Sequence, residues 1–193
     1  LVTFGMSIII QNALLEFYSA DSRKLQTGWF ETASLEISDQ VAVGLLPFMM
    51  FLTAVAVIGC LQFVFYRTSL GRMLRATSDD PEIVPLMGGN NNHIFALATG
   101  LASLVVGIAG IWLAMKTNFD PSAGPARLLF AFEAVIIGGL GNLWGTLLGG
   151  IILGVAQTIG AQIDAGYQIL AGHLAFLVIL ILKPSGLMPR VKQ

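Results

Sequence analysis

A single polar segment, residues 66–93, holds many of the few charged side chains in this chain. Its charged residues are Arg67, Arg72, Arg75, Asp79, Asp80 and Glu82. An uncharged apolar stretch long enough to cross a bilayer lies on either side of it. We interpret the segment as a loop that contacts a partner protein at the cytoplasmic face. The alternative is a solvated connector whose charges only keep it in water.

The loop also carries the signals of a short helix. Residues 78–82 read Ser-Asp-Asp-Pro-Glu, which supplies a capping oxygen, a proline for the first helical position and an acid near the positive end of the helix dipole. Gly88 and Gly89 offer a left-handed stop. The pattern predicts a helix of about two turns, interrupted at Pro85, which is too short to be stable without a surface to lie on.

Glu133 is the only acid in the apolar stretch 128–163. An ionisable side chain inside an apolar span is costly unless it pairs or faces water, so it is a functional hypothesis by default. The basic candidates on the outer side are Lys116 and Arg127. The alternative is a position close enough to the outer interface for the carboxylate to stay hydrated.

No catalytic constellation is visible in the sequence. It contains no HExxH, CxxC, GxSxG or phosphate-loop motif. His93 and His173 lie far apart in the sequence, and both are interpreted as structural. Cys60 is interpreted as a small buried hydrophobe. We therefore predict no catalytic residue, no metal site and no cofactor bound by this chain.

Composition indicates an integral membrane protein. Of 193 residues, 55% are hydrophobic and 11% are charged, and the mean hydropathy is +0.80. The net charge of -1 argues against nucleic-acid binding, which needs a basic face. The predicted fold is all-α, a polytopic transmembrane helical bundle. Because Leu1 opens directly in an apolar run, we expect a truncated span there and further chain upstream.

The apolar windows give the expected domain organisation, a single transmembrane domain over residues 1–193. The predicted spans are 1–18 (truncated), 41–65, 94–115, 128–141, 143–163 and 166–182. The stretch 128–163 is divided at Gly138–Asn142, where glycine lowers helix propensity. A re-entrant half-helix is the alternative there. Lys183-Pro184 ends the last span.

The basic residues give an orientation. Arginines of the loop 66–93 and the basic residues after 182 assign both segments to the cytoplasm by the positive-inside rule. Residues 19–40 and 116–127 then face outward.

Glycines repeat at intervals of four in the region 138–154. Gly141, Gly145 and Gly149 form one series, and Gly150 and Gly154 form another. Small residues on one helix face let another backbone approach closely, so we expect close packing; a glycine-walled substrate path is the alternative. The residues assigned to helix packing or to the translocation path are Glu133, Gly138, Gly139, Gly141, Gly145, Gly149 and Gly150.

Three motifs together resemble a known family. They are Gly71-Arg72-Met73-Leu74-Arg75-Ala76 with the following Asp79-Asp80 and Leu86-Met87-Gly88, the glycine-rich run from Phe132 to Gly150, and Lys183-Pro184-Ser185-Gly186-Leu187. In order and spacing they resemble the inner-membrane permeases of bacterial branched-chain amino acid ABC importers. The resemblance covers nearly the whole chain and implies that about a third of the usual permease precedes Leu1.

The resemblance implies a mechanism and partners. Such permeases work in the bacterial inner membrane as homo- or heterodimers, receive substrate from a periplasmic binding protein and dock two cytoplasmic ATPases, which use ATP and Mg. A short coupling helix makes that contact, and by position it is Asp80–Gly88 here, although Ile83-Val84-Pro85 departs from the family's helix-favouring alanines. The coupling-loop residues are Arg72, Arg75, Asp79, Asp80, Pro81, Glu82, Leu86, Met87 and Gly88.

Other functions remain open at this point. A urea or short-chain amide permease would share the same architecture. A passive channel would share the glycine-rich spans but would need no ATPase. An intramembrane enzyme would need a positioned nucleophile and base, and the sequence shows neither.

Overall fold

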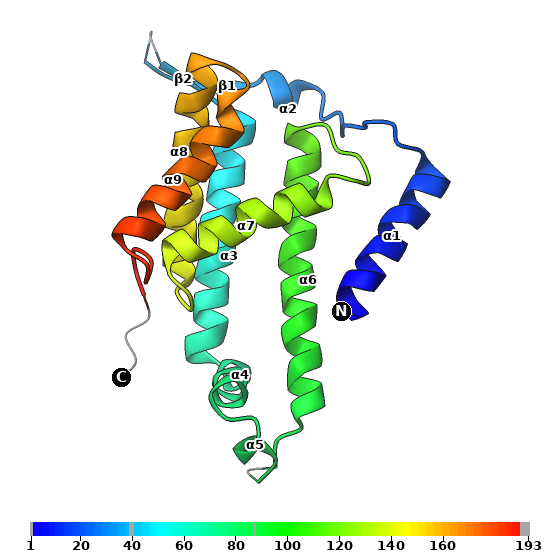
Figure 1. Ribbon diagram of the computed structural model, residues 1–193, viewed down its shortest axis with the longest axis vertical. Coiled ribbons are helices and arrows are strands. Elements are labelled where there is room, and N and C mark those ends of the chain that lie inside the picture. Colours follow the sequence, from blue (N-terminus) through cyan, green and yellow to red (C-terminus); the bar gives the residue numbers. More distant parts are fainter. Residues whose placement is uncertain (1, 39–40, 87, 190–193) are drawn as a thin grey trace. The chain divides into compact units, whose positions relative to one another are not determined.

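A computed structural model describes residues 2–38, 41–86 and 88–189, and most of them are helical (Figure 1). The elements in chain order are α1 (Val2–Tyr18), α2 (Trp29–Thr32), β1 (Ser34–Ser38), β2 (Val41–Gly44), α3 (Leu45–Arg67), α4 (Ser69–Asp79), α5 (Ile83–Leu86), α6 (Asn91–Lys116), α7 (Gly124–Gly138), α8 (Leu143–Ile163) and α9 (Tyr167–Leu182). The predicted all-α class is confirmed, with one small hairpin added. The chain divides into two compact units, unit 1 (residues 1–17 and 121–193) and unit 2 (residues 18–120).

Among the residues that the structure describes, three helices have the length and composition to cross a membrane. They are α3 with 23 residues, α6 with 26 and α8 with 21. At about 1.5 Å per residue each is roughly 30 Å long or more, the thickness of a hydrocarbon core. The helices α1 and α9 are also apolar but shorter.

Unit 2 is built on α3 and α6, joined by α4 and α5. Figure 1 shows α3 leading into α4 and α5 before the chain returns along α6. The helix α6 begins at a cap on Asn90, whose Oδ1 accepts from the backbone N–H groups of Asn92 and His93. The polar loop is therefore closed at both ends by spanning-length helices.

A two-stranded hairpin precedes α3. Ser34 of β1 stands opposite Gly44 of β2, and Leu35 stands opposite Val43. Residues 41–44, which the sequence assigns to the first complete span, are thus a strand, and α3 begins at Leu45. The physical reason lies in the local sequence: Val-Ala-Val favours extended backbone, and Pro47 is tolerated in the first helical turn, whose N–H groups lack helical partners.

Two segments far apart in sequence pair within unit 2. The backbone N–H of Arg23 donates to the carbonyl of Phe119 at 2.9 Å, and the N–H of Phe119 donates back to Arg23 at 2.8 Å. The N–H of Leu25 donates to the carbonyl of Ala114 at 3.0 Å. The segment after α1 and the segment after α6 therefore lie side by side.

Unit 1 contains α1, α7, α8 and α9, and α8 packs against both α7 and α9 (Figure 1). The break between α7 and α8 contains Gly139 at φ 99° and Gly141 at φ 83°. Only glycine adopts such angles without strain, which explains why the helix ends here. Where the sequence predicts the span 128–141, the helix α7 runs from Gly124 to Gly138, since Pro125 in the first turn starts the helix earlier.

Candidate functional site

The first motif forms an elbow between α3 and α4. Thr68 caps α4: its Oγ1 accepts from the N–H of Gly71 at 3.2 Å and donates to the carbonyl of Val64 at 2.6 Å. Gly71 is buried, and a Cβ there would lie closer than 3.0 Å to the carbonyl oxygens of Val64 and Phe65. Only glycine lets α4 leave α3 at this distance.

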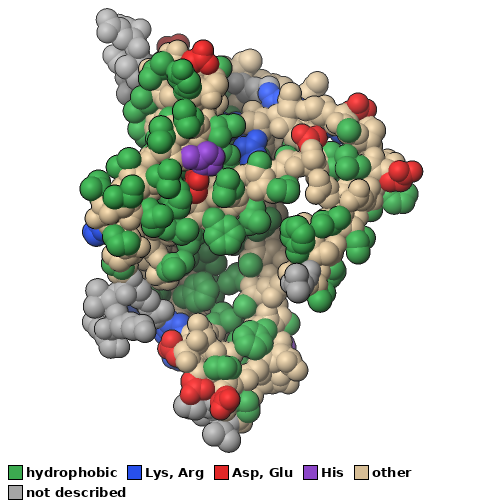
Figure 2. All heavy atoms as spheres, in the orientation of Figure 1, with side chains coloured by type: hydrophobic (Ala, Val, Ile, Leu, Met, Phe, Trp, Pro, Cys, Tyr) green, Lys and Arg blue, Asp and Glu red, His purple; other side chains and the backbone are tan. Residues whose placement is uncertain are grey.

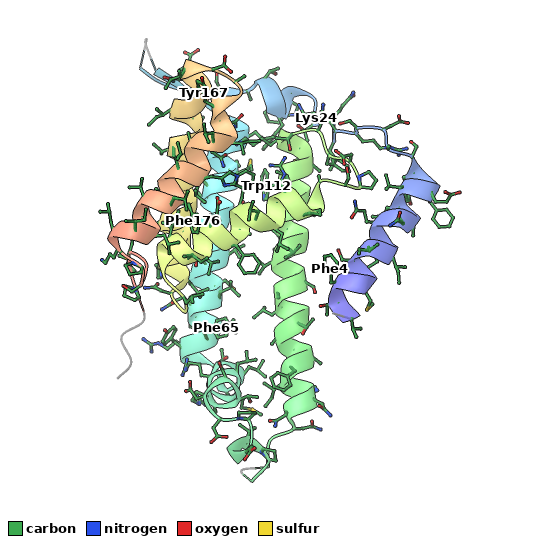
Figure 3. The ribbon with its side chains drawn as sticks, in the orientation of Figure 1. Phe4, Lys24, Phe65, Trp112, Tyr167 and Phe176 are labelled. Carbon is green, nitrogen blue, oxygen red and sulfur yellow. The ribbon has the colours of Figure 1, made fainter. Side chains whose placement is uncertain are left out.

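Arg75 holds the elbow from the next turn of α4. Its Nη1 donates to the carbonyl of Phe65, and its guanidinium lies 5.0 Å from the centroid of the Tyr66 ring, a cation–π contact. Phe65 is labelled in Figure 3, near the end of α3 beside α4. Arg72 on the same helix is exposed. The two arginines of the motif therefore differ: Arg75 fixes the angle between α3 and α4, whereas the side chain of Arg72 is exposed.

The expected helix Asp80–Gly88 is wrong in its bounds. The residue pattern at 78–82 marks the end of α4, where Asp80 is an extended C-cap, and α5 has only four residues. Asp80 still caps locally, since its Oδ1 accepts from the N–H of Glu82 at 2.9 Å. The main helix of the loop is Ser69–Asp79, which begins at the N-cap Thr68 and which the pattern at 78–82 does not predict.

The rest of the loop turns back toward α6. Gly88 has φ 80°, as a left-handed stop requires, and Asn91 Nδ2 donates to the carbonyl of Pro81 at 2.6 Å. Leu86 is the last residue of α5, and Met87 lies outside the described residues. Asp79, Pro81 and Glu82 are exposed. Figure 2 shows acidic side chains gathered at the α4–α5 end of unit 2.

The glycine-rich region forms a backbone crossing between α7 and α8. A Cβ added to Gly138 would meet backbone atoms of Gly145 closer than 3.0 Å, and one added to Gly149 would meet Ala134 equally closely. Gly150, by contrast, has nothing within 4 Å, and neither has Gly154. The expected packing series thus needs two corrections: Gly141 lies outside α8, and the second series faces open space.

The third motif closes the end of α7. The N–H of Leu187 donates to the carbonyl of Ile137 at 2.8 Å, and the N–H of Met188 donates to the carbonyl of Gly138 at 3.0 Å. We call residues 183–188 the C-terminal clasp. It supplies donors to carbonyls at the end of α7, where a helix leaves them without partners. The glycine-rich motif and the terminal motif therefore form one structural site. One of their contacts joins Asn142 and Met188, which are 46 positions apart in the sequence.

Asn142 joins the clasp to α8. Its Oδ1 accepts from the N–H of Gly145 at 3.1 Å, as an N-cap does, while its Nδ2 donates to the carbonyl of Met188 at 3.0 Å.

Replacing Asn142 by Ala removes both contacts of its side chain. We expect the loss to be about 2 kcal/mol, the upper end for an N-cap, because the clasp contact goes with the cap. Asn90→Ala, which removes the N-cap of α6 and no clasp contact, is the matched control and should cost about 1 kcal/mol. Thermal unfolding of the full-length protein in detergent measures both. Equal decreases in the thermal midpoint of the two variants would contradict the dual role of Asn142.

Glu133 meets His173 inside unit 1. His173 Nδ1 lies 2.5 Å from Glu133 Oε1, and the Glu133 residue is only 4% exposed. The imidazole stacks on Phe130, with centroids 5.5 Å apart and planes at 6°. Tyr167 and Phe176, labelled in Figure 3, lie on α9 before and after His173.

The partner of Glu133 differs from the sequence expectation. Lys116 and Arg127 were the candidates, and His173 was interpreted as structural, yet His173 makes the contact. The two residues are 40 positions apart, so no local pattern in the sequence indicates that they pair. One signal was available: His173 is the only Asp, Glu, Lys, Arg or His in α9, and Glu133 is the only acid in α7.

Together the helices and the sites define a membrane protein. The helix α3 is apolar along 23 residues, yet only Leu46 in it is buried, and α9 buries only Gly172. Uncovered apolar helices of this length require lipid around them. The chain belongs to the family described as branched-chain amino acid transport system, permease component, whose pattern it matches over residues 1–182. The resemblance seen in the three motifs is confirmed.

Individual relatives agree with this family. The chain is 30% identical to the high-affinity branched-chain amino acid transport system permease protein BraD of Pseudomonas aeruginosa and 26% identical to LivH of Escherichia coli, with 96% of the chain aligned to each. It is also 26% identical, over 83% of its length, to the ribose import permease protein RbsC of Haemophilus influenzae. The chain spans 62% of the length of BraD and LivH. No solved structure is significantly similar to it.

Proposed function

We propose that this chain is part of the membrane-spanning permease subunit of an ATP-driven importer that moves branched-chain or related amino acids. The observation that carries the proposal is the family match over residues 1–182. The partners are a second permease subunit, two cytoplasmic ATPases, a periplasmic substrate-binding protein and the lipid of a bacterial inner membrane, which the protein crosses several times. ATP and Mg belong to the ATPases, and this chain binds neither.

The geometry of unit 2 supports the proposed orientation. The segments after α1 and after α6, which the sequence assigns to the outer face, are joined by the backbone pairing of Arg23 with Phe119. The polar loop with α4 and α5 leaves from the opposite ends of α3 and α6. In this proposal the loop, with Arg72, Asp79, Pro81 and Glu82 exposed, is the surface that receives an ATPase.

The relatives leave two substrate classes to compare. BraD and LivH are named for branched-chain amino acids, and RbsC is named for ribose. Amino acids are the first candidate because the BraD and LivH alignments cover more of the chain, 96% against 83%.

Reconstitution tests the function. The full-length protein, its partner permease and both ATPases are reconstituted in liposomes with ATP inside. The binding protein and the radiolabelled substrate are added outside. We expect ATP-dependent uptake of radiolabelled leucine and none of ribose or urea. Uptake of leucine without ATP would identify a passive channel, and uptake of urea or ribose alone would reassign the substrate.

Arg75→Ala should uncouple transport from ATP hydrolysis. The change removes the bond to Phe65 and the contact with Tyr66, so α4 loses its fixed angle to α3. A hydrogen bond to a charged group contributes about 1.5–3 kcal/mol, which predicts a fall in leucine uptake of about tenfold or more. Glu16→Ala, at an exposed residue of α1 outside the loop, is the control and should transport normally. Normal uptake by the Arg75 variant, with normal amounts in the membrane, would reject this role of the elbow.

A further inference from the structure

One oxygen of the buried Glu133 carboxylate has no hydrogen-bond partner within the described chain. Oε1 lies within hydrogen-bond distance of His173 Nδ1, whereas Oε2 is buried and unpaired. Each oxygen of a carboxylate can accept hydrogen bonds, and this capacity is unused at Oε2. Buried polar atoms in folded proteins are nearly always hydrogen-bonded, so the unpaired oxygen requires an explanation.

The helices around Glu133 do not supply the missing donor. No Lys or Arg occurs in α8 or α9, Tyr167 is exposed, and no neutral donor of these helices, Gln157 of α8 included, is hydrogen-bonded to Oε2. Arg127 is the only basic residue of α7; it is exposed and six positions from Glu133, a spacing that does not place two side chains on one helix face. None of the described side chains donates to Oε2, which leaves this oxygen open to a donor from outside the described chain.

We propose that Oε2 of Glu133 binds the ammonium group of the transported amino acid, with His173 as the residue that positions the carboxylate. The inference rests on the proposed function. An ammonium group brings three donors and the positive charge that a buried carboxylate lacks. The imidazole side chain is 32% exposed and stacks on Phe130, so the exposed side of the pair is the imidazole, which lies beside an apolar ring suited to an aliphatic side chain.

The charge on Glu133 makes the site selective. A charge-assisted hydrogen bond is about twice as strong as a neutral one. Urea and sugars offer only neutral donors to Oε2, so their hydrogen bonds there are weaker than those of an ammonium group at the same position. An organic acid of the same shape is repelled.

Binding to the purified complex tests the site directly. The full-length permease with its ATPases, without the binding protein, is titrated in detergent by calorimetry with isobutylamine, with 3-methylbutanoate and with urea. We expect the wild type to bind isobutylamine in preference to the other two. Glu133→Gln should weaken isobutylamine binding about tenfold or more, whereas Glu16→Gln, an exposed acid on α1, should leave it unchanged. Equal binding of the amine and the acid by the wild type would overturn the proposal, whatever the variants do.

Two further variants separate positioning from folding. Glu133→Asp keeps the charge and should retain part of the amine affinity. His173→Asn keeps a donor close to the position of Nδ1 and should bind isobutylamine better than His173→Leu, at equal thermal stability without ligand. Equal affinities of these two variants would remove the positioning role.

The outcomes also distinguish this inference from the proposed function. If the complete transporter takes up leucine while Glu133→Gln binds isobutylamine like the wild type, only the ammonium site is wrong. If leucine is not transported but amine binding still depends on Glu133, the site stands and the proposed function is wrong.

Discussion

Gly149→Leu is expected to destabilise the protein strongly, while the same change at Gly150 is tolerated. A Cβ at Gly149 would lie within 3.0 Å of backbone atoms of Ala134 and Gly138, which belong to α7 and have no side-chain freedom to yield. Forcing a leucine between two helix backbones costs about 3 kcal/mol or more. In a protein of this size that lowers the thermal midpoint by roughly 6–12 °C.

The neighbouring glycine gives the control. Gly150 has open space where its Cβ would be, so Gly150→Leu adds an apolar side chain without a collision. Both variants of the full-length protein are compared by thermal unfolding in detergent and by the yield of folded protein. A similar midpoint for the two would show that α7 and α8 do not cross at Gly149.

Gly186→Ala is expected to open the clasp. Gly186 has φ 81°, and its Cβ would lie within 3.0 Å of the Cα of Gly139 and the carbonyl oxygen of Ile136. Left-handed backbone alone costs a non-glycine residue about 1–2 kcal/mol. The collision adds to this, so we expect a total of about 3 kcal/mol or more.

Gly88→Ala isolates the backbone term. Gly88 has φ 80° and nothing within 4 Å of its Cβ position, so its substitution shows the conformational cost without a collision. The measurement is the thermal midpoint, together with the rate at which chymotrypsin cleaves after Leu187. Faster cleavage is expected for the Gly186 variant alone, and equal behaviour of the two variants would contradict the contact between the clasp and Gly139.

The sequence was sufficient for the helical class and for the places where apolar helices are interrupted. Hydropathy windows and glycine positions carry this information locally, as at Gly138–Asn142 and at Lys183. The polar segment holds two capping signals, but the prediction used only the Ser-Asp-Asp-Pro-Glu pattern, whereas Thr68 starts the longer helix α4. Local propensity alone does not rank two such signals.

The contacts that build the candidate sites were harder to predict. Glu133 meets His173, and Asn142 meets Met188, across 40 and 46 positions. These pairings depend on how α7, α8 and α9 cross, which in turn depends on contacts at Gly138 and Gly149 that no single-helix pattern describes. The glycine periodicity indicated close packing, but it did not show that Gly145 and Gly149 face α7 while Gly150 does not.

The clasp also sets an order of events during synthesis. The carbonyls of Ile137 and Gly138 receive donors from residues 187 and 188, which the ribosome makes only after α8 and α9. Until then these carbonyls face an apolar environment or keep water beside them, and in lipid each unsatisfied group costs several kcal/mol. A nascent chain that ends after α9 therefore contains α7, α8 and α9 but still lacks the donors that complete the end of α7.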